Sequence, residues 1–230
     1  MQPSEPAIIP LHAMPPALAP EEQARADLYA LIARLFLAAP DAPLLSALAG
    51  ADYLPSRQTD APLDTAWEEL ILAASLMDAQ AVEEEFSALF ISVGTPAINP
   101  YASFYLSGFM MEKPLAALRA DLVRLGLGRR PEVRESEDHL GALCEAMRLL
   151  IVDTTGVAAA MRQPLQRQKE FFLTHIAPWY SRCLDDIRHA EGSNFYRPVA
   201  DFAQAFFALE FQAFEMEDMQ DDERGEHAWN

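Results

Sequence analysis

The sequence predicts an all-α fold, a single compact bundle of several helices. Apolar residues recur every three or four positions along most of the chain, no segment alternates regularly between apolar and polar residues, and only 9 of the 230 residues are glycine. With 51% hydrophobic residues, the chain is long enough to bury a substantial core. No repeat with a period of about 20–50 residues is visible, which disfavours a solenoid.

The chain divides into three parts. Residues 1–19 contain five prolines, which remove backbone donors and interrupt helices, so we expect a flexible arm there. Residues 20–217 carry the helical pattern and form the expected domain. From Glu215 onward there are seven acidic residues and one arginine, and like-charge repulsion predicts a frayed or disordered acidic tail over 218–230.

The first helix is expected to begin at Pro20, because proline suits a first helical turn and the acidic Glu21 and Glu22 follow beside the positive helix end. It should end near the turn at 40–43. Helical spacing of apolar residues then continues over 63–77, 86–90, 103–111 and 115–125. The breaks at 93–101 and 125–135 are rich in Gly and Pro and predict loops.

The second half of the chain predicts four more helices. Ser136 is the expected N-cap of the first of them, with Glu137 and Asp138 in its first turn and Gly156 at its end. The others are expected over 161–175, 178–190 and 195–217. The last is apolar around much of its circumference, so it should be largely buried.

The charge balance narrows the classes of partner. The chain has 17 basic and 35 acidic residues, a net charge of −18, which repels nucleic acid and attracts a basic peptide. Its two cysteines are too few for a disulfide framework, which favours a reducing cytoplasm. No secretory signal and no apolar run of about 18 residues is present, so we expect a cytoplasmic protein without membrane insertion.

Familiar catalytic and cofactor motifs are missing, and we expect no catalytic residue, no cofactor and no metal. His139 and Cys144 lie five residues apart, on different faces of a helix, so they do not form a metal pair. Asp138 and His139 could act as acid and base. Neighbours on a helix diverge by about 100°, however, and charges that complement the helix dipole are the favoured interpretation.

The segment NPYASFYL predicts a rigid turn that carries aromatic rings with polar tips. Pro100 fixes the backbone, Ser103 can cap the following turn, and Tyr101 and Tyr105 lie four residues apart. Such a turn suits peptide binding. The alternative, equally weighted on these residues alone, is a packed loop whose tyrosines cover the core.

Four segments in order carry a more specific signal. They are Glu85-Phe86-x-x-Leu89-Phe90, Pro100-Tyr101-x-Ser103-x-Tyr105, Glu137-Asp138-His139-Leu140 with Met147, and Phe171-x-x-x-His175-x-x-Pro178-Trp179. Together they resemble the TorD/DmsD/NarJ family of cytoplasmic redox-enzyme maturation chaperones. The resemblance implies a TorD-like helical bundle that binds the twin-arginine leader or the apo form of a molybdenum-cofactor oxidoreductase subunit, assists cofactor insertion and prevents premature export.

The resemblance also implies a leader-binding surface. Carried over by motif, its residues are Phe86, Leu89, Phe90, Pro100, Tyr101, Ser103, Tyr105, Glu137, Asp138 and His139. We expect Phe90 and Tyr101 to receive the apolar segment of the leader, the two acids to face its arginines, and His139 to donate a hydrogen bond or report pH. The segment from His175 to Trp179 is interpreted as structural.

Three alternatives stay open at this stage. One is a nitrate-reductase-type assembly factor that binds a non-exported catalytic subunit. The others are an all-α enzyme that uses Asp138 and His139, and a generic helical adaptor. An apolar helix face can serve as core or as dimer interface, so the sequence leaves both a monomer and a homodimer open. The client oxidoreductase is not identified by any residue.

Overall fold

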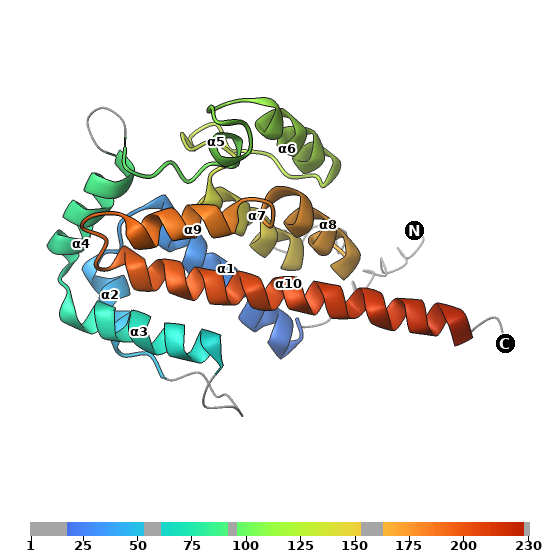
Figure 1. Ribbon diagram of the computed structural model, residues 1–230, viewed down its shortest axis with the longest axis horizontal. Coiled ribbons are helices and arrows are strands. Elements are labelled where there is room, and N and C mark those ends of the chain that lie inside the picture. The colour runs from blue at the N-terminus through green and yellow to red at the C-terminus, as the bar shows by residue number, and fades with distance from the viewer. Residues whose placement is uncertain (1–17, 53–60, 92–95, 153–162, 228–230) are drawn as a thin grey trace, which may run out of the picture.

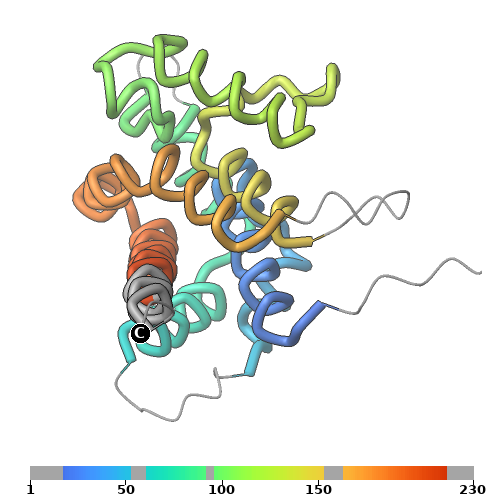
Figure 2. Tube along the Cα trace, turned by 90° about the vertical axis from the view of Figure 1, so that its right-hand side faces the viewer, coloured from blue at the N-terminus to red at the C-terminus, as the bar shows by residue number. Residues whose placement is uncertain are grey.

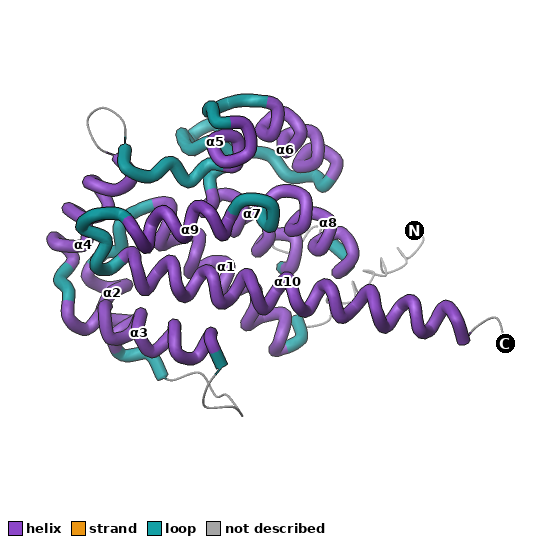
Figure 3. Tube along the Cα trace, in the orientation of Figure 1, coloured by secondary structure: helices purple, strands orange, loops and turns teal. Residues whose placement is uncertain are grey.

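The computed structural model describes residues 18–52, 61–91, 96–152 and 163–227, with side chains up to residue 216. Figures 1 and 3 show that these ranges form helices and loops without a strand. The α-helices are α1 (Pro20–Leu37), α2 (Ala42–Ala49), α3 (Pro62–Leu76), α4 (Ala79–Phe86), α5 (Ala102–Ser107), α6 (Lys113–Arg124), α7 (Leu140–Ile151), α8 (Leu165–His175), α9 (Tyr180–His189) and α10 (Tyr196–His227). A π-helix, η1 (Ser87–Ile91), continues α4. The all-α prediction is confirmed.

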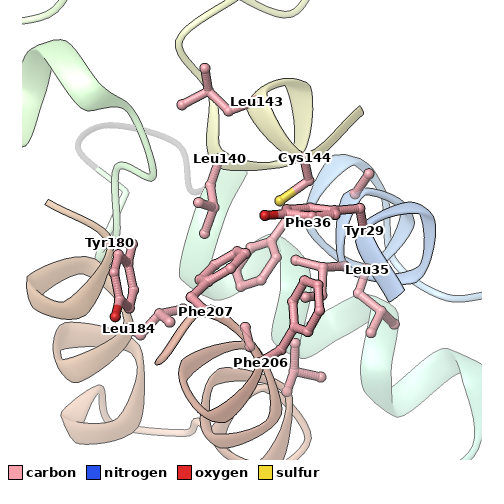
Figure 4. Close-up of a cluster of buried hydrophobic side chains, with 14 of the residues drawn as sticks. Tyr29, Leu35, Phe36, Leu140, Leu143, Cys144, Tyr180, Leu184, Phe206 and Phe207 are labelled. Carbon is pink, nitrogen blue, oxygen red and sulfur yellow. The ribbon is translucent and has the colours of Figure 1, made fainter. Parts of the chain in front are cut away.

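The core lies between α1, α7, α9 and α10 (Figure 4), where side chains from all four helices gather. Helix α1 packs along α7, and α10 packs against α9 and α3. The close approach of α1 and α7 depends on Gly141, because a Cβ there would lie 2.7 Å from Leu37 Cγ and 3.0 Å from the Ala33 carbonyl oxygen. Most aromatic residues of α10, among them Phe202, Phe206 and Phe207, are fully buried, and Phe211 is half-buried, so the helix is largely buried as the pattern predicted.

Helices α5 and α6 and the loops that flank them form a smaller layer on one side of this bundle. The layer is seen at the top of Figures 1 and 2. Its main helix contact with the bundle is between α5 and α9. We call residues 101–139 the α5–α6 layer. It contains most of the residues expected to bind a leader, so its construction decides what the site can do.

Several expected boundaries were wrong. Helix α7 begins at Leu140 with His139 as its N-cap, so Ser136 is not the cap, and Glu137 and Asp138 precede the helix. The reason is a pairing between distant backbone segments: the Ala102 N–H donates to the Asp138 carbonyl, and the Leu140 N–H donates to the Pro100 carbonyl. This pairing holds His139 in an extended conformation, so the helix cannot begin before Leu140.

Three further segments differ from expectation. The 86–90 stripe lies mostly in the π-helix η1, and the helix expected over 103–111 ends at Ser107. Helix α10 continues to His227, although the acidic run predicted frayed structure from Glu215. Its last part contains no proline and is rich in residues with high helix propensity, which outweigh the charge repulsion. The arm at 1–17 and Gly156 lie outside the described residues.

None of the helices in the described ranges is long and apolar enough to cross a membrane.

Candidate functional site

The first motif, on α4 and η1, is largely built into the core. Phe86 and Leu89 are buried, and Phe90 is half-buried. The ring of Tyr196 lies 5.8 Å from that of Phe86 and 5.0 Å from that of Phe90, between centroids. Phe90 also meets the edge of Phe36 at 6.2 Å. Of these three predicted residues, Phe90 therefore keeps the most surface for a ligand.

Glu85, which begins the same motif, has a structural task that sequence reasoning missed. Its carboxylate accepts hydrogen bonds from the backbone N–H groups of Asn194 and Tyr196 at Oε1 (3.0 and 2.8 Å) and of Phe195 at Oε2 (3.0 Å). The side chain is buried and satisfies the free N–H groups at the start of α10. The position of this acid next to the apolar stripe of α4 was the only sign of such a task in the sequence. The N–H groups that it binds lie more than a hundred residues away.

The second and third motifs meet in the α5–α6 layer. Tyr101 and His139 form an isolated backbone bridge, and their rings meet edge to face at 5.0 Å. The Tyr101 hydroxyl donates to Glu135 at 2.7 Å, and burial together with this carboxylate raises the pKa of Tyr101. The sequence placed both motifs in one site, and the structure brings them into direct contact.

Asp138 is not the exposed first-turn acid that the sequence predicted. It is 1% exposed. Its Oδ2 accepts from the backbone N–H and the hydroxyl of Ser103 (3.0 and 2.5 Å), and its Oδ1 accepts from the Ser136 hydroxyl (2.7 Å). Ser103 is fully buried and does not cap a helix. Asp138 therefore holds α5 in place, and its carboxylate does not face solvent or an incoming arginine.

His139 is also inaccessible, with 5% exposure. Its Nδ1 accepts a hydrogen bond from the Gly141 N–H at 3.1 Å, so this nitrogen carries no proton. Burial lowers the pKa of His139 to about 4, against the opposing charges of Glu135 and Asp138. The imidazole is therefore neutral near pH 7. A buried carboxylate and a buried neutral imidazole do not form an open acid–base pair.

Glu137 lies nearer the surface, already paired with two arginines of its own chain. It accepts from Arg119 at 2.8 Å and lies 3.4 Å from the Nε of Arg129. Burial would raise its pKa, but the hydrogen bond and charge of Arg119 outweigh this effect, so the pKa of Glu137 is lowered. A leader arginine at this position would have to share or replace these partners.

Tyr105 joins the layer to α9. Its hydroxyl donates to Asp186 at 2.8 Å, its ring stacks on Trp179 with centroids 5.5 Å apart, and Arg182 lies 5.9 Å above the ring. Trp179 is 1% exposed and donates to the His175 carbonyl, as its structural interpretation requires. Tyr105 is half-buried, so part of its ring remains at the surface.

The described residues contain no group of three or more His, Cys, Asp or Glu side chains that could hold a metal ion. Cys144 and Cys183 are free and buried, and burial raises the pKa of both thiols. These are the properties of structural cysteines rather than of reactive ones.

A model of the protein family described as nitrate reductase delta subunit matches residues 56–185, which is more than half of the chain. The chain belongs to this family. It is 28% identical over 203 residues to the chaperone protein TorD of Psychrobacter sp. (strain PRwf-1), a match that covers 84% of this chain and 92% of that protein. It is 23% identical over 138 residues to the chaperone protein TorD of Vibrio parahaemolyticus, covering 58% of this chain and 64% of that protein.

The fold has a counterpart among solved structures. A proposed redox enzyme maturation protein from Archaeoglobus fulgidus superposes with a TM-score of 0.51 at 17% identity, covering 78% of this chain and 93% of that chain. The predicted resemblance to the TorD/DmsD/NarJ family and the TorD-like helical fold are both confirmed. The family match includes every predicted site residue, from Phe86 to His139.

Proposed function

We propose that this protein is a non-enzymatic chaperone that binds the twin-arginine leader, the apo form or both of a molybdenum-cofactor oxidoreductase subunit in the cytoplasm. In this role it assists cofactor insertion and prevents premature export. The observation that carries the proposal is membership of the family together with similarity to TorD over 92% of a curated relative.

The charge of the chain supports a cationic ligand. At −18, its field accelerates the approach of a leader that carries two arginines, and it gives orientation more than affinity. Of the ten predicted residues, Phe90, Tyr101, Tyr105 and Glu137 keep part of their surface. Direct contact with a leader is proposed for the three of these that lie in the α5–α6 layer, Tyr101, Tyr105 and Glu137. Ser103, Asp138 and His139 act from within the α5–α6 layer.

A second candidate is a nitrate-reductase-type assembly factor whose client is not exported. The description of the matching family as nitrate reductase delta subunit favours it. The two candidates differ in one observable property of the client, the presence of a twin-arginine leader.

The test is affinity purification of the tagged protein from the cells that naturally contain it, with mass spectrometry of the captured proteins. Glu137→Gln serves as a second bait, and Glu68→Gln, an exposed acid on α3 at the opposite side of the bundle, serves as its control. We expect a molybdoenzyme catalytic subunit with its leader intact, reduced only by Glu137→Gln. A leaderless subunit would establish the second candidate, and absence of any oxidoreductase would overturn both.

A further inference from the structure

The connection between α5 and α6 exposes an unusual run of apolar side chains. Leu106 is 41% exposed, Phe109 71%, Met110 38% and Met111 75%. We call Leu106–Met111 the apolar turn. Large apolar side chains are common singly on surfaces, but several in succession are characteristic of an interaction site. Each of these four side chains keeps more than a third of its surface exposed in the described part of the chain.

The apolar turn has a defined conformation. Gly108 ends α5 in the left-handed region at φ +81°, and its N–H donates to the Phe104 carbonyl at 2.9 Å. Met111 has φ +59° and is the one non-glycine residue with positive φ in the described ranges. A bulky side chain is rarely found in this conformation, which persists only where the surroundings enforce it.

Hydrogen bonds to buried residues of the motifs hold Met111 in this conformation. Its N–H donates to the Ser103 hydroxyl at 3.2 Å, and that hydroxyl donates to Asp138 at 2.5 Å. The Ser107 hydroxyl lies 2.6 Å from the Ser103 carbonyl oxygen and 3.3 Å from that of Phe109. Ser103 and Asp138, two of the residues expected to touch a leader, thus lie directly beneath the apolar turn and fix its shape.

The charge distribution indicates which part of a ligand belongs there. The α5–α6 layer has six basic and six acidic residues, so it has no net charge, and the −18 of the chain lies on the remainder. An uncharged layer with exposed Phe and Met side chains suits an apolar segment, whereas the acidic remainder suits a cationic one. Methionine adapts its shape to different apolar partners, which suits a segment defined by composition more than by sequence.

We propose that Phe109, Met110 and Met111 form the docking surface for the apolar segment of a twin-arginine leader, and that Ser103 and Asp138 are positioning residues that hold this surface in place. The inference rests on the proposed function and specifies which part of the leader binds where. The arginines of the same leader then lie toward Glu137 and the acidic bundle.

The test uses the full chain and a labelled probe peptide with two consecutive arginines followed by about 12 Leu and Ala residues, the usual length of the apolar part of such leaders. A second peptide keeps the arginines and replaces the apolar residues with Ser and Gly. The variant is the double substitution F109S/M111S, and the matched control is Leu76→Ser on α3, whose side chain is also 75% exposed. Circular dichroism melting establishes that both variants fold.

We expect F109S/M111S to weaken binding of the apolar probe about tenfold, since two large side chains lose their burial. Leu76→Ser should leave the affinity unchanged, and the Ser/Gly peptide should bind all three proteins equally. Equal affinity of the wild type and F109S/M111S for the apolar probe would overturn this inference alone. Failure of the wild type to bind both the probe and the leader of its natural client would overturn the leader binding of the proposed function as well.

Other occupants of the apolar turn give different results. If it joins two copies of this chain, F109S/M111S converts a dimer to a monomer in sedimentation and leaves probe affinity unchanged. If it binds lipid, the same variant abolishes co-sedimentation with phosphatidylcholine vesicles and again leaves probe affinity unchanged. Either result would overturn the proposal.

The positioning role is tested by Ser103→Ala, which removes the link between Met111 and Asp138. We expect this substitution to weaken binding of the apolar probe in the wild-type background. In F109S/M111S it should have no further effect on binding, although it should lower the free energy of unfolding in both backgrounds. A merely structural residue would weaken binding equally in both backgrounds, and that outcome would contradict the assignment.

Discussion

Two regions contain the residues that the motifs assigned to leader binding, and they are built differently. On α4 and η1, Phe86 and Leu89 pack into the aromatic core against α10, next to the carboxylate of Glu85 at the start of that helix. In the α5–α6 layer, Ser103 and Asp138 are equally buried but hold an exposed apolar turn above them. The difference teaches that motif residues with similar burial can have different structural tasks, since one pair fills the core and the other supports an exposed surface.

The largest effect is expected from Glu85→Ala, which leaves three backbone N–H groups at the start of α10 without their acceptor, two of them buried. We expect a loss of about 3 kcal/mol in the free energy of unfolding, because hydrogen bonds to a buried charge are strong and costly to lose. Denaturant unfolding measures it. The control is the same substitution at Glu83, an exposed acid on α4. It should change the free energy of unfolding by less than about 0.5 kcal/mol. Similar losses for both would contradict the capping role.

Asp138→Ala is expected to cost about 2–3 kcal/mol, because the Ser103 N–H and hydroxyl and the Ser136 hydroxyl lose their acceptor. An acid in the first turn of a helix, where the sequence placed Asp138, would cost only about 0.3–1 kcal/mol to remove. Thermal and denaturant unfolding give the value. In contrast to Glu85→Ala, this variant should also weaken leader binding by the folded protein. A stable variant with normal binding would show that the network does not hold the apolar turn.

A pH effect is expected from His139, whose pKa of about 4 in the folded chain lies below its value of about 6.5 when unfolded. The unfolded chain binds the proton more readily, so the stability contributed by the neutral imidazole is complete above pH 6.5 and falls as the pH decreases toward 4. The contribution lost by pH 5 is about 2 kcal/mol. His139→Asn should flatten this part of the stability profile, measured by urea unfolding from pH 4.5 to 7.5. The same substitution at exposed His189 should leave the slope unchanged.

The smallest stability effect is expected from Glu137→Gln. Arg119, its nearer partner, is half exposed, so the ion pair contributes less than about 1 kcal/mol. Binding of an arginine-containing leader should weaken about two- to fivefold at low salt, and the difference should shrink as salt screens the charge. Titrations at two ionic strengths measure it. A larger effect at high salt than at low salt would argue against an electrostatic role.

Helical spacing predicted the fold class and most helices, because each amphipathic stripe is a local signal. The start of α7 was misplaced since it depends on backbone pairing between Pro100–Ala102 and Asp138–Leu140, segments far apart in the chain. The π-helix escaped detection because a five-residue stripe does not distinguish it from an α-helix. The cap that Glu85 provides for α10 joins residues more than a hundred positions apart.

The candidate site was also predicted only in part, because burial depends on contacts between distant segments. The resemblance placed Tyr101 and His139 in one site, and the structure brings them together. It gave no information on burial, so it did not reveal that Asp138 is buried and accepts a hydrogen bond from Ser103. The apolar turn was absent from the motifs, although Phe109, Met110 and Met111 after Gly108 were a visible cluster. Their exposure depends on how α5 ends.

We propose that a leader binds over the α5–α6 layer and not in the aromatic cluster of α4 and η1. Hydrogen–deuterium exchange of the full chain, with and without the leader of its client, tests it most directly. We expect slower exchange in residues 103–113 on binding and unchanged exchange in residues 86–91. Protection confined to 86–91, with no change in 103–113, would contradict it.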